Sequence, residues 1–128
     1  RAFGPSRSKD IPKKYASIGQ PVILPGSMET GSYLLTGCDK ADRETFASTA
    51  HGAGRIMSRS AAIKQFDGKE LQASMLKKGI YVHGVSTKGL AEEAGGAYKD
   101  IESVAQTLHD LGITKKVVKF TPIGNIKG

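Results

Sequence analysis

The twelve residues from 48 to 59 constrain this chain most, because two glycines interrupt them at alternate positions. They read Ser48-Thr49-Ala50-His51-Gly52-Ala53-Gly54-Arg55-Ile56-Met57-Ser58-Arg59. Glycine lacks a Cβ and tolerates positive φ, so this backbone can close on a charged ligand and present its N–H groups to it. A helix beginning near Gly54 would add unpaired amides and the positive end of its dipole. The stretch therefore predicts a phosphate-binding turn.

The charged side chains of the same stretch support that interpretation. Arg55 and Arg59 are four residues apart, so on one helix they would share a face and present two guanidinium groups along it. His51 would lie at the mouth of the pocket, where a neutral imidazole is a competent nucleophile. The alternative is a histidine that only fills a turn or packs in the core, and the spacing alone does not decide between the two.

The composition bounds the size of the fold and the class of partner. A length of 128 residues suits one domain or a piece of a larger one, and sixteen glycines predict a loop-rich fold. The formal net charge of +7 favours polyanionic partners, with nucleic acid as the first candidate. A basic protein that is merely soluble would have the same composition.

Cysteine content and hydropathy bear on the compartment. The single cysteine, Cys38, excludes an internal disulfide, suits a reducing compartment and follows an apolar run, so we expect a buried thiol. No apolar run approaches membrane-spanning length, and no signal peptide is visible. We expect a cytoplasmic protein without membrane contact. Because the chain starts at Arg1 without methionine, we also expect that an upstream segment has been removed.

The hydrophobic pattern predicts an α+β fold of mixed short strands and helices. Phe46 is expected to anchor the approach to the histidine stretch. Residues 1–14 are expected to form a basic loop. Residues 39–45 are expected to be helix or loop, residues 84–98 a loop apart from a turn at 90–94, and residues 122–128 an extended tail docked through two isoleucines. The expected strands are 21–25, 32–37, 80–83 and 113–120, and the expected helices are 54–65, 69–78 and 100–112.

An ordered set of short motifs gives the sequence a resemblance that covers nearly the whole chain. The chain resembles the C-terminal part of RtcB-type RNA ligases, which join RNA ends in tRNA splicing and RNA repair. The motifs are Gly19-Gln20-Pro21-Val22, Pro25-Gly26-Ser27-Met28, Ser48 to Arg55 with Met57-Ser58-Arg59, Glu92-Glu93-Ala94, Ala97-Tyr98-Lys99-Asp100 and Pro122-Ile123-Gly124-Asn125-Ile126-Lys127-Gly128. Residues 1–128 would then be the C-terminal segment of an RtcB-like domain.

The resemblance implies a mechanism. The histidine at the position of His51 attacks the α-phosphate of GTP and becomes covalently guanylylated. The guanylate passes to an RNA 3′-phosphate, or to an end derived from a 2′,3′-cyclic phosphate, and a 5′-hydroxyl then attacks the activated end. Manganese ions polarise the phosphates and neutralise developing charge. The implied partners are RNA, the upstream part of the same protein and archease.

The resemblance also implies roles for further residues. Arg55 would be a catalytic or RNA-phosphate contact, and Arg59 an RNA contact. The nucleotide would be bound by the backbone of Ala53 and Gly54, by Ser27 and Ser32 near the guanine or ribose, by Tyr98 stacking near the base and by Lys127 reaching the guanine. The family usually has glycine at the position of Glu29 and often proline at that of Gly95, which leaves the first nucleotide loop and the approach to Tyr98 less defined.

The metal ligands of the family lie upstream of the region that this chain resembles. Cys38, His83 and His109 do not match them, so no metal ligand is assigned, and the chain alone is expected to lack manganese-dependent ligation. Two other interpretations stay open at this point: a module that binds nucleotide or RNA without catalysis, and a structural remnant whose glycines reflect packing.

Overall fold

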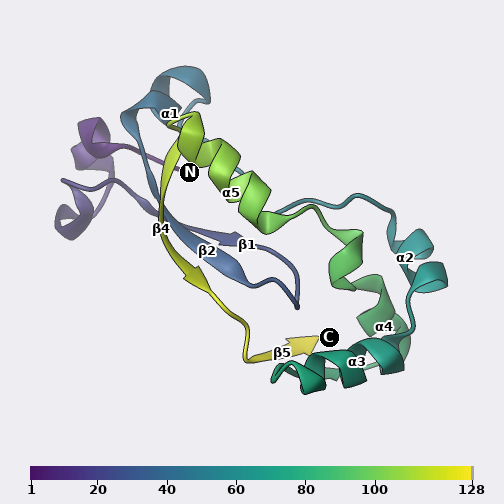
Figure 1. The fold of residues 1–128 in the computed structure, drawn as a ribbon. Coiled ribbons are helices and arrows are strands. Elements are labelled where there is room, and N and C mark those ends of the chain that lie inside the picture. The colour runs from purple at the N-terminus through teal and green to yellow at the C-terminus, as the bar shows by residue number, and fades with distance from the viewer. Residues whose placement is uncertain (128) are drawn as a thin grey trace.

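The computed structural model describes residues 1–127 and confirms a mixed α+β fold (Figure 1). Two 3₁₀ helices, η1 and η2, precede the first strand, and a third, η3, precedes the last long helix. The elements in order are η1 (Pro5–Asp10), η2 (Lys13–Tyr15), β1 (Pro21–Pro25), β2 (Ser32–Gly37), α1 (Asp39–Glu44), α2 (Arg59–Gln65), α3 (Gly68–Lys77), β3 (Tyr81–Gly84), α4 (Thr87–Glu92), η3 (Gly95–Ala97), α5 (Ile101–Asp110), β4 (Thr114–Phe120) and β5 (Gly124–Lys127).

A three-stranded antiparallel sheet with the order β1-β2-β4 forms one half of the molecule. β1 and β2 make a hairpin in which Leu24 pairs with Tyr33, and β4 returns from near the end of the chain to pair with β2. Alternate side chains of β1 and β2 point to α5, which lies along one face of this sheet (Figure 1). The main core lies between them and contains Leu24, Tyr33, Leu35, Ala53, Ile101 and Ala105.

The opposite face of this sheet carries apolar side chains without a covering helix. Ile23 and Val117 are 57% and 56% exposed. Leu34 and Val117 border a cavity of about 870 Å³, together with residues of the N-terminal segment such as Tyr15 and Ile18. This cavity is lined by none of the residues that the sequence predicts for the nucleotide site.

The second half of the molecule consists of α2, α3, α4 and a two-stranded parallel sheet of β3 and β5 (Figure 1). Its core packs Met75 of α3 against Ile80, Val82 and Leu90. Met28, from the loop after β1, belongs to this second core, so the loop spans the two halves.

Polar side chains fix where the helices begin. Asp100 accepts hydrogen bonds from the backbone N–H groups of Glu102 and Ser103, which starts α5 at the predicted position. Ser58 caps α2 through the Ala61 N–H, so this helix begins at Arg59 and not near Gly54. The predicted start was wrong because the residues around Arg55 pair with another extended segment instead.

Two other predictions also differ from the structure. Residues 84–98 were expected to form a loop with a turn at 90–94, yet they contain α4, which Ser86 caps through the Gly89 N–H. Residues 1–14 are not only a loop, because they form η1 and begin η2, and Ala2 is fully buried. Because α4 contains a glycine and the N-terminal segment contains prolines, the sequence pattern did not predict these short helices.

The C-terminal tail is extended, as predicted, and docks as β5 beside β3. The predicted docking through isoleucines was wrong, because Ile123 and Ile126 are both 84% exposed. The tail is held by its backbone pairing and by Asn125, whose Nδ2 donates to the Met28 carbonyl at 3.1 Å. The last predicted residue of the tail, Gly128, lies outside the described residues.

Within residues 1–127, none of the helices has the length and apolar content that a membrane crossing requires.

Candidate functional site

A strained turn leads into the histidine stretch. Phe46 and Ala47 both have φ of 54°, a conformation that is uncommon outside glycine. Ala47 is buried, and its N–H donates to the Ala41 carbonyl at 2.9 Å, whereas Phe46 is 84% exposed. The prediction that Phe46 anchors this approach was therefore wrong, since the small neighbouring alanine does so.

His51 is exposed on a bend, so its imidazole is accessible from solvent. Two residues later the chain is fixed, because Ala53 is buried and its N–H donates to the Pro25 carbonyl at 3.0 Å. That amide is engaged within the protein. Gly54 is exposed and has φ of +79°, a left-handed backbone conformation that a side chain would strain, so glycine is favoured at this position.

The segment after Gly54 pairs with the residues around Tyr98. The Lys99 N–H donates to the Gly54 carbonyl at 2.9 Å, and the Ile56 N–H donates to the Ala97 carbonyl at the same distance. Arg55 and Tyr98 form an antiparallel bridge between these two bonds. Arg55 therefore lies in extended backbone while Arg59 starts α2, so the prediction of a shared helical face was wrong.

The Arg55 guanidinium is held by several groups at once. It lies over the Tyr98 ring, 4.7 Å from the centroid, and its Nη1 is 2.9 Å from Tyr98 Oη. Its Nη2 donates to the Glu92 carbonyl at 2.6 Å, and its Nε donates to the Met57 carbonyl at 3.2 Å. Its Nη1 also pairs with Glu93 Oε1 at 3.4 Å. Arg55 is thus fixed against the residue predicted to stack near the base.

Glu93 joins three residues that the sequence assigns to the site. Besides pairing with Arg55, its Oε2 accepts from Tyr98 Oη at 2.7 Å and lies 3.4 Å from Lys127 Nζ. Burial on its own would raise the pKa of Glu93, but the Tyr98 hydroxyl, Lys127 and Arg55 together lower it below its ordinary value. Sequence reasoning missed this role, although the Glu92-Glu93-Ala94 motif is five residues from Tyr98.

The loop after β1 approaches the same region. Ser27 Oγ accepts from the backbone N–H groups of Glu29 and Thr30, which orders the turn. Glu29 Oε2 accepts from the Gly95 N–H at 2.9 Å, so this loop is joined to the segment that leads to Tyr98. Ser32 begins β2 opposite Pro25, which is the residue that binds the Ala53 amide. The predicted nucleotide-binding segments thus form one connected framework.

Two basic side chains lie at the border of this framework. Arg59 is 71% exposed, and its Nε pairs with Glu92 Oε1 at 2.7 Å. Lys99 is also exposed and packs its stem beside Gly54, because its Cδ would lie 3.8 Å from a Cβ built there. Among the described residues, Lys99 takes part in no ion pair. Sequence reasoning did not assign Lys99, although it lies between Tyr98 and the α5 cap.

Residues 1–127 do not fit a metal ion, because nowhere among them do three His, Cys, Asp or Glu side chains gather. Cys38 is a free, half-buried thiol whose pKa is raised by burial. His83 and His109 are exposed on β3 and α5, apart from any such group. We assign no metal ligand and no metal-dependent step to the residues of this chain.

Comparison with known proteins identifies the family of the chain. A family model described as tRNA-splicing ligase RtcB matches residues 1–128. Over all 128 residues the chain is 54% identical to tRNA-splicing ligase RtcB of Methanococcus maripaludis and 48% identical to that of Thermococcus kodakarensis, covering 26% of each protein's length. It is also 48% identical to that of Pyrococcus furiosus, where it covers 13% of the length. The chain spans about a quarter or less of the length of these relatives. It therefore belongs to the tRNA-splicing ligase RtcB family, as its match over all 128 residues shows.

Proposed function

We propose that this chain is the guanylate-accepting, C-terminal portion of a GTP-dependent RNA ligase. One observation carries the proposal beyond family membership. Arg55, Tyr98 and Lys127 come from three distant parts of the chain and meet on a single carboxylate, Glu93. Such convergence of charged and aromatic groups, in a chain whose His51 is exposed, is typical of a ligand site.

The proposed first step is transfer of GMP to His51. A neutral imidazole nitrogen of His51 attacks the α-phosphate of GTP, a phosphorus–nitrogen bond forms, and the bond to the β-phosphate oxygen breaks to release pyrophosphate. The exposed position of His51 on its bend lets a ligand of this size approach it. The covalent intermediate divides one difficult displacement into two easier ones.

The second step moves the guanylate to RNA. A terminal 3′-phosphate oxygen displaces His51 from the phosphorus, and a 5′-hydroxyl then attacks the activated RNA phosphate to release GMP. The exposed guanidinium of Arg59 is suited to hold RNA phosphate, and so is the ammonium of Lys99. The net charge of +7 supports an RNA substrate.

The nucleotide contacts follow the connected framework. Tyr98 offers its ring near the base and Lys127 its ammonium to the guanine, while Gly54 and Ala53 line the phosphate with backbone. The Ala53 N–H is engaged by Pro25, so Gly54 is the better amide donor of the two. Ser27 and Ser32 approach the guanine or the ribose, on the strength of their places beside Glu29 and Pro25.

Other parts of the complete activity would come from outside residues 1–127. The relatives from Methanococcus and Thermococcus are longer, since the chain covers 26% of each. We propose that manganese ligands lie in the upstream part of such a protein, which also serves as the partner of this segment. RNA is the proposed substrate, archease a further protein partner, and the cytoplasm, which suits the free Cys38, the compartment.

Labelling with GTP tests the proposed function. The full-length protein is incubated with manganese and GTP labelled at the α-phosphate, and the adduct is treated with acid or alkali. We expect label that resists alkali, is lost in acid and disappears in His51→Ala. His83→Ala and His109→Ala are the matched controls, because both histidines are exposed and should leave the label intact. A full-length protein without any adduct would contradict the proposal and favour a module that binds without catalysis.

A further inference from the structure

We propose that Glu93 is a positioning residue that sets where the Lys127 ammonium and the Arg55 guanidinium lie relative to Tyr98. This inference rests on the proposed function, in which those three side chains contact the nucleotide or RNA. Glu93 itself is 23% exposed and is placed between them by the segment that links α4 to η3.

The two carboxylate oxygens divide the contacts. Oε1 pairs with Arg55 Nη1 at 3.4 Å, and Oε2 binds both the Tyr98 hydroxyl at 2.7 Å and Lys127 Nζ at 3.4 Å. The Glu93 carboxylate thus connects three parts of the chain, which are the extended segment at residues 54–56, Tyr98 and strand β5.

The contact orients Lys127 without occupying all of its donors. An ammonium has three N–H groups, so pairing with Glu93 leaves two for acceptors on a ligand such as a guanine carbonyl. The Tyr98 hydroxyl donates to Glu93, which fixes the ring but leaves its faces to Arg55 and to a base. Glu93 therefore prepares the site for a ligand instead of blocking it.

Arg55 depends on Glu93 less than Lys127 does. Its guanidinium also contacts the Met57 and Glu92 carbonyls and the Tyr98 ring, so three independent contacts hold it if Glu93 is neutralised. For Lys127, the carboxylate of Glu93 is the one ion-pair partner among the described residues. Loss of that charge should release the lysine and leave two cations repelling one another.

The expected signature is a change in nucleotide affinity with little change in the chemical step. A contact that positions a binding group in the ground state affects half-saturation, whereas a group that acts only in the transition state affects the maximal rate. Loss of one charge-assisted hydrogen bond corresponds to about a tenfold change in an equilibrium constant. We expect Glu93→Gln to raise the GTP concentration for half-maximal guanylylation about tenfold and to change the maximal rate by less than about threefold.

Glu92→Gln is the matched control. It neutralises the neighbouring glutamate, whose side chain pairs with the exposed Arg59 and whose backbone carbonyl still receives Arg55. This variant should leave GTP half-saturation unchanged. Glu93→Asp, which keeps the charge on a shorter stem, should recover part of the affinity lost in Glu93→Gln.

Single-turnover guanylylation and equilibrium GTP binding, measured on the full-length protein, test the inference. Glu93→Gln combined with Lys127→Ala should be only slightly worse than Lys127→Ala alone, because the contact with Lys127 carries most of the effect of Glu93. Multiplicative losses, an unchanged half-saturation in Glu93→Gln, or the same loss in Glu92→Gln would overturn the positioning role. Thermal unfolding excludes a folding defect as the cause. If the wild type forms no adduct, the proposed function fails, while the binding measurement still decides the role of Glu93.

Discussion

The Glu29 carboxylate accepts a hydrogen bond from the Gly95 N–H at 2.9 Å. The family that the chain resembles is expected usually to carry glycine at the position of Glu29 and often proline at that of Gly95, and the structure brings the two positions into contact. A Cβ built on Gly95 would lie 2.3 Å from Glu29 Oε2, which leaves no room for a larger residue while the glutamate keeps this place. We therefore expect the residues at the two positions to depend on one another.

A double-mutant cycle tests that dependence. Gly95 is the first residue of η3, where a proline ring is tolerated, but proline has no N–H for Glu29. We expect Gly95→Pro alone to destabilise the protein by about 1–3 kcal/mol, because it removes the Gly95 N–H from the Glu29 carboxylate, which then keeps its pair with Lys78, and brings the proline ring against Oε2. The same change made together with Glu29→Gly should cost clearly less, as measured by urea unfolding of the full-length protein. Additive costs would show that the contact carries no coupling.

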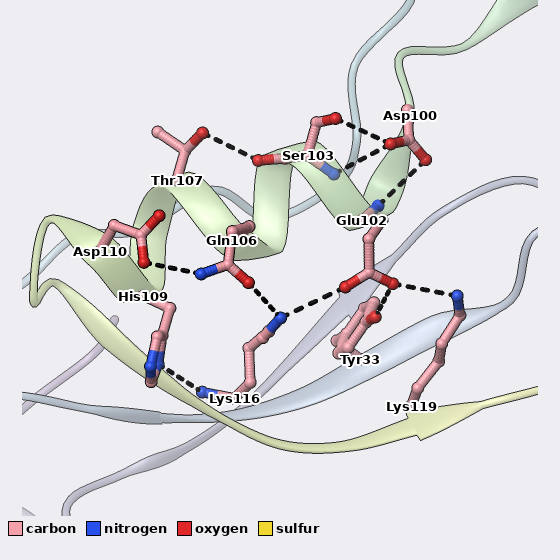
Figure 2. A network of polar contacts seen from close by, with 10 residues as sticks. All are labelled: Tyr33, Asp100, Glu102, Ser103, Gln106, Thr107, His109, Asp110, Lys116 and Lys119. Carbon is pink, nitrogen blue, oxygen red and sulfur yellow. Dashed lines mark hydrogen bonds and ion pairs between the residues drawn. The ribbon is translucent and has the colours of Figure 1, made fainter.

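A second prediction concerns pH and the polar network between α5 and β4 (Figure 2). The Tyr33 hydroxyl, Lys119 and Lys116 all donate to Glu102, and they lower its pKa from 4.5 to about 2. Since the folded pKa lies below the ordinary value, the stabilisation is present above pH 4.5 and is lost as the pH falls towards 2. This carboxylate is well exposed, so we expect a modest effect.

Glu102→Gln should remove this pH dependence. The difference in melting temperature between wild type and variant should be largest above pH 4.5 and should shrink as the pH falls towards 2. Gln106→Ala, which removes a neutral member of the same network, should shift the melting temperature by a constant amount. A wild-type difference that stayed constant across this window would mean that Glu102 is not held in its charged form.

A third prediction concerns Lys99, whose stem lies beside Gly54. Because it takes part in no ion pair among residues 1–127, its ammonium is available for a phosphate that binds beside Gly54. We expect Lys99→Ala to lower the rate of guanylylation or joining about tenfold, the size of one charge-assisted hydrogen bond. Lys64→Ala, at an exposed position of α2, is the control and should be silent. Equal rates in both variants would exclude Lys99 from the site.

A fourth prediction separates the two arginines. Arg55→Ala removes contacts to Tyr98, Glu93 and two carbonyls, so we expect it to reduce GTP binding, RNA joining and thermal stability together. Arg59→Ala removes an exposed pair worth less than about 1 kcal/mol, so stability and guanylylation should hold while RNA joining weakens. The salt dependence of RNA binding should also become less steep in Arg59→Ala. Unchanged RNA joining in Arg59→Ala would show that this arginine makes no contact with RNA on which joining depends.

Local signals predicted the long elements well. The apolar run between prolines gives β1, and Asp100 followed by helical spacing gives α5, because capping and periodicity are encoded within a few residues. A glycine in α4 and prolines near the N-terminus account for the short helices that the pattern did not predict, whereas the wrong start of α2 came from a contact between distant residues. The pairing of Arg55 with Tyr98 keeps the chain extended where its local sequence favours a helix. The helix α2 therefore begins later, after its N-cap Ser58.

The site shows the same division. The glycines of the motif around His51 predicted a backbone conformation that other residues rarely adopt, and Gly54 does take a positive φ. The residue that joins the site, Glu93, could not be found in this way, because two of its three partners, Arg55 and Lys127, are distant in sequence and spacing alone does not reveal its contact with Tyr98. Likewise, spacing says nothing about the contact between Glu29 and Gly95, which are 66 residues apart.

The location of a GMP adduct tests directly whether His51 is the guanylate acceptor. Trypsin cleaves after Arg43 and Arg55, so the peptide of residues 44–55 contains His51 and no other histidine. After incubation of the full-length protein with GTP and manganese, mass spectrometry should find the mass of GMP on this peptide, with fragmentation placing it on His51. The adduct should be absent after acid treatment. GMP on another residue, or a full-length protein that remains unmodified, would contradict the assignment of His51 as the guanylate acceptor.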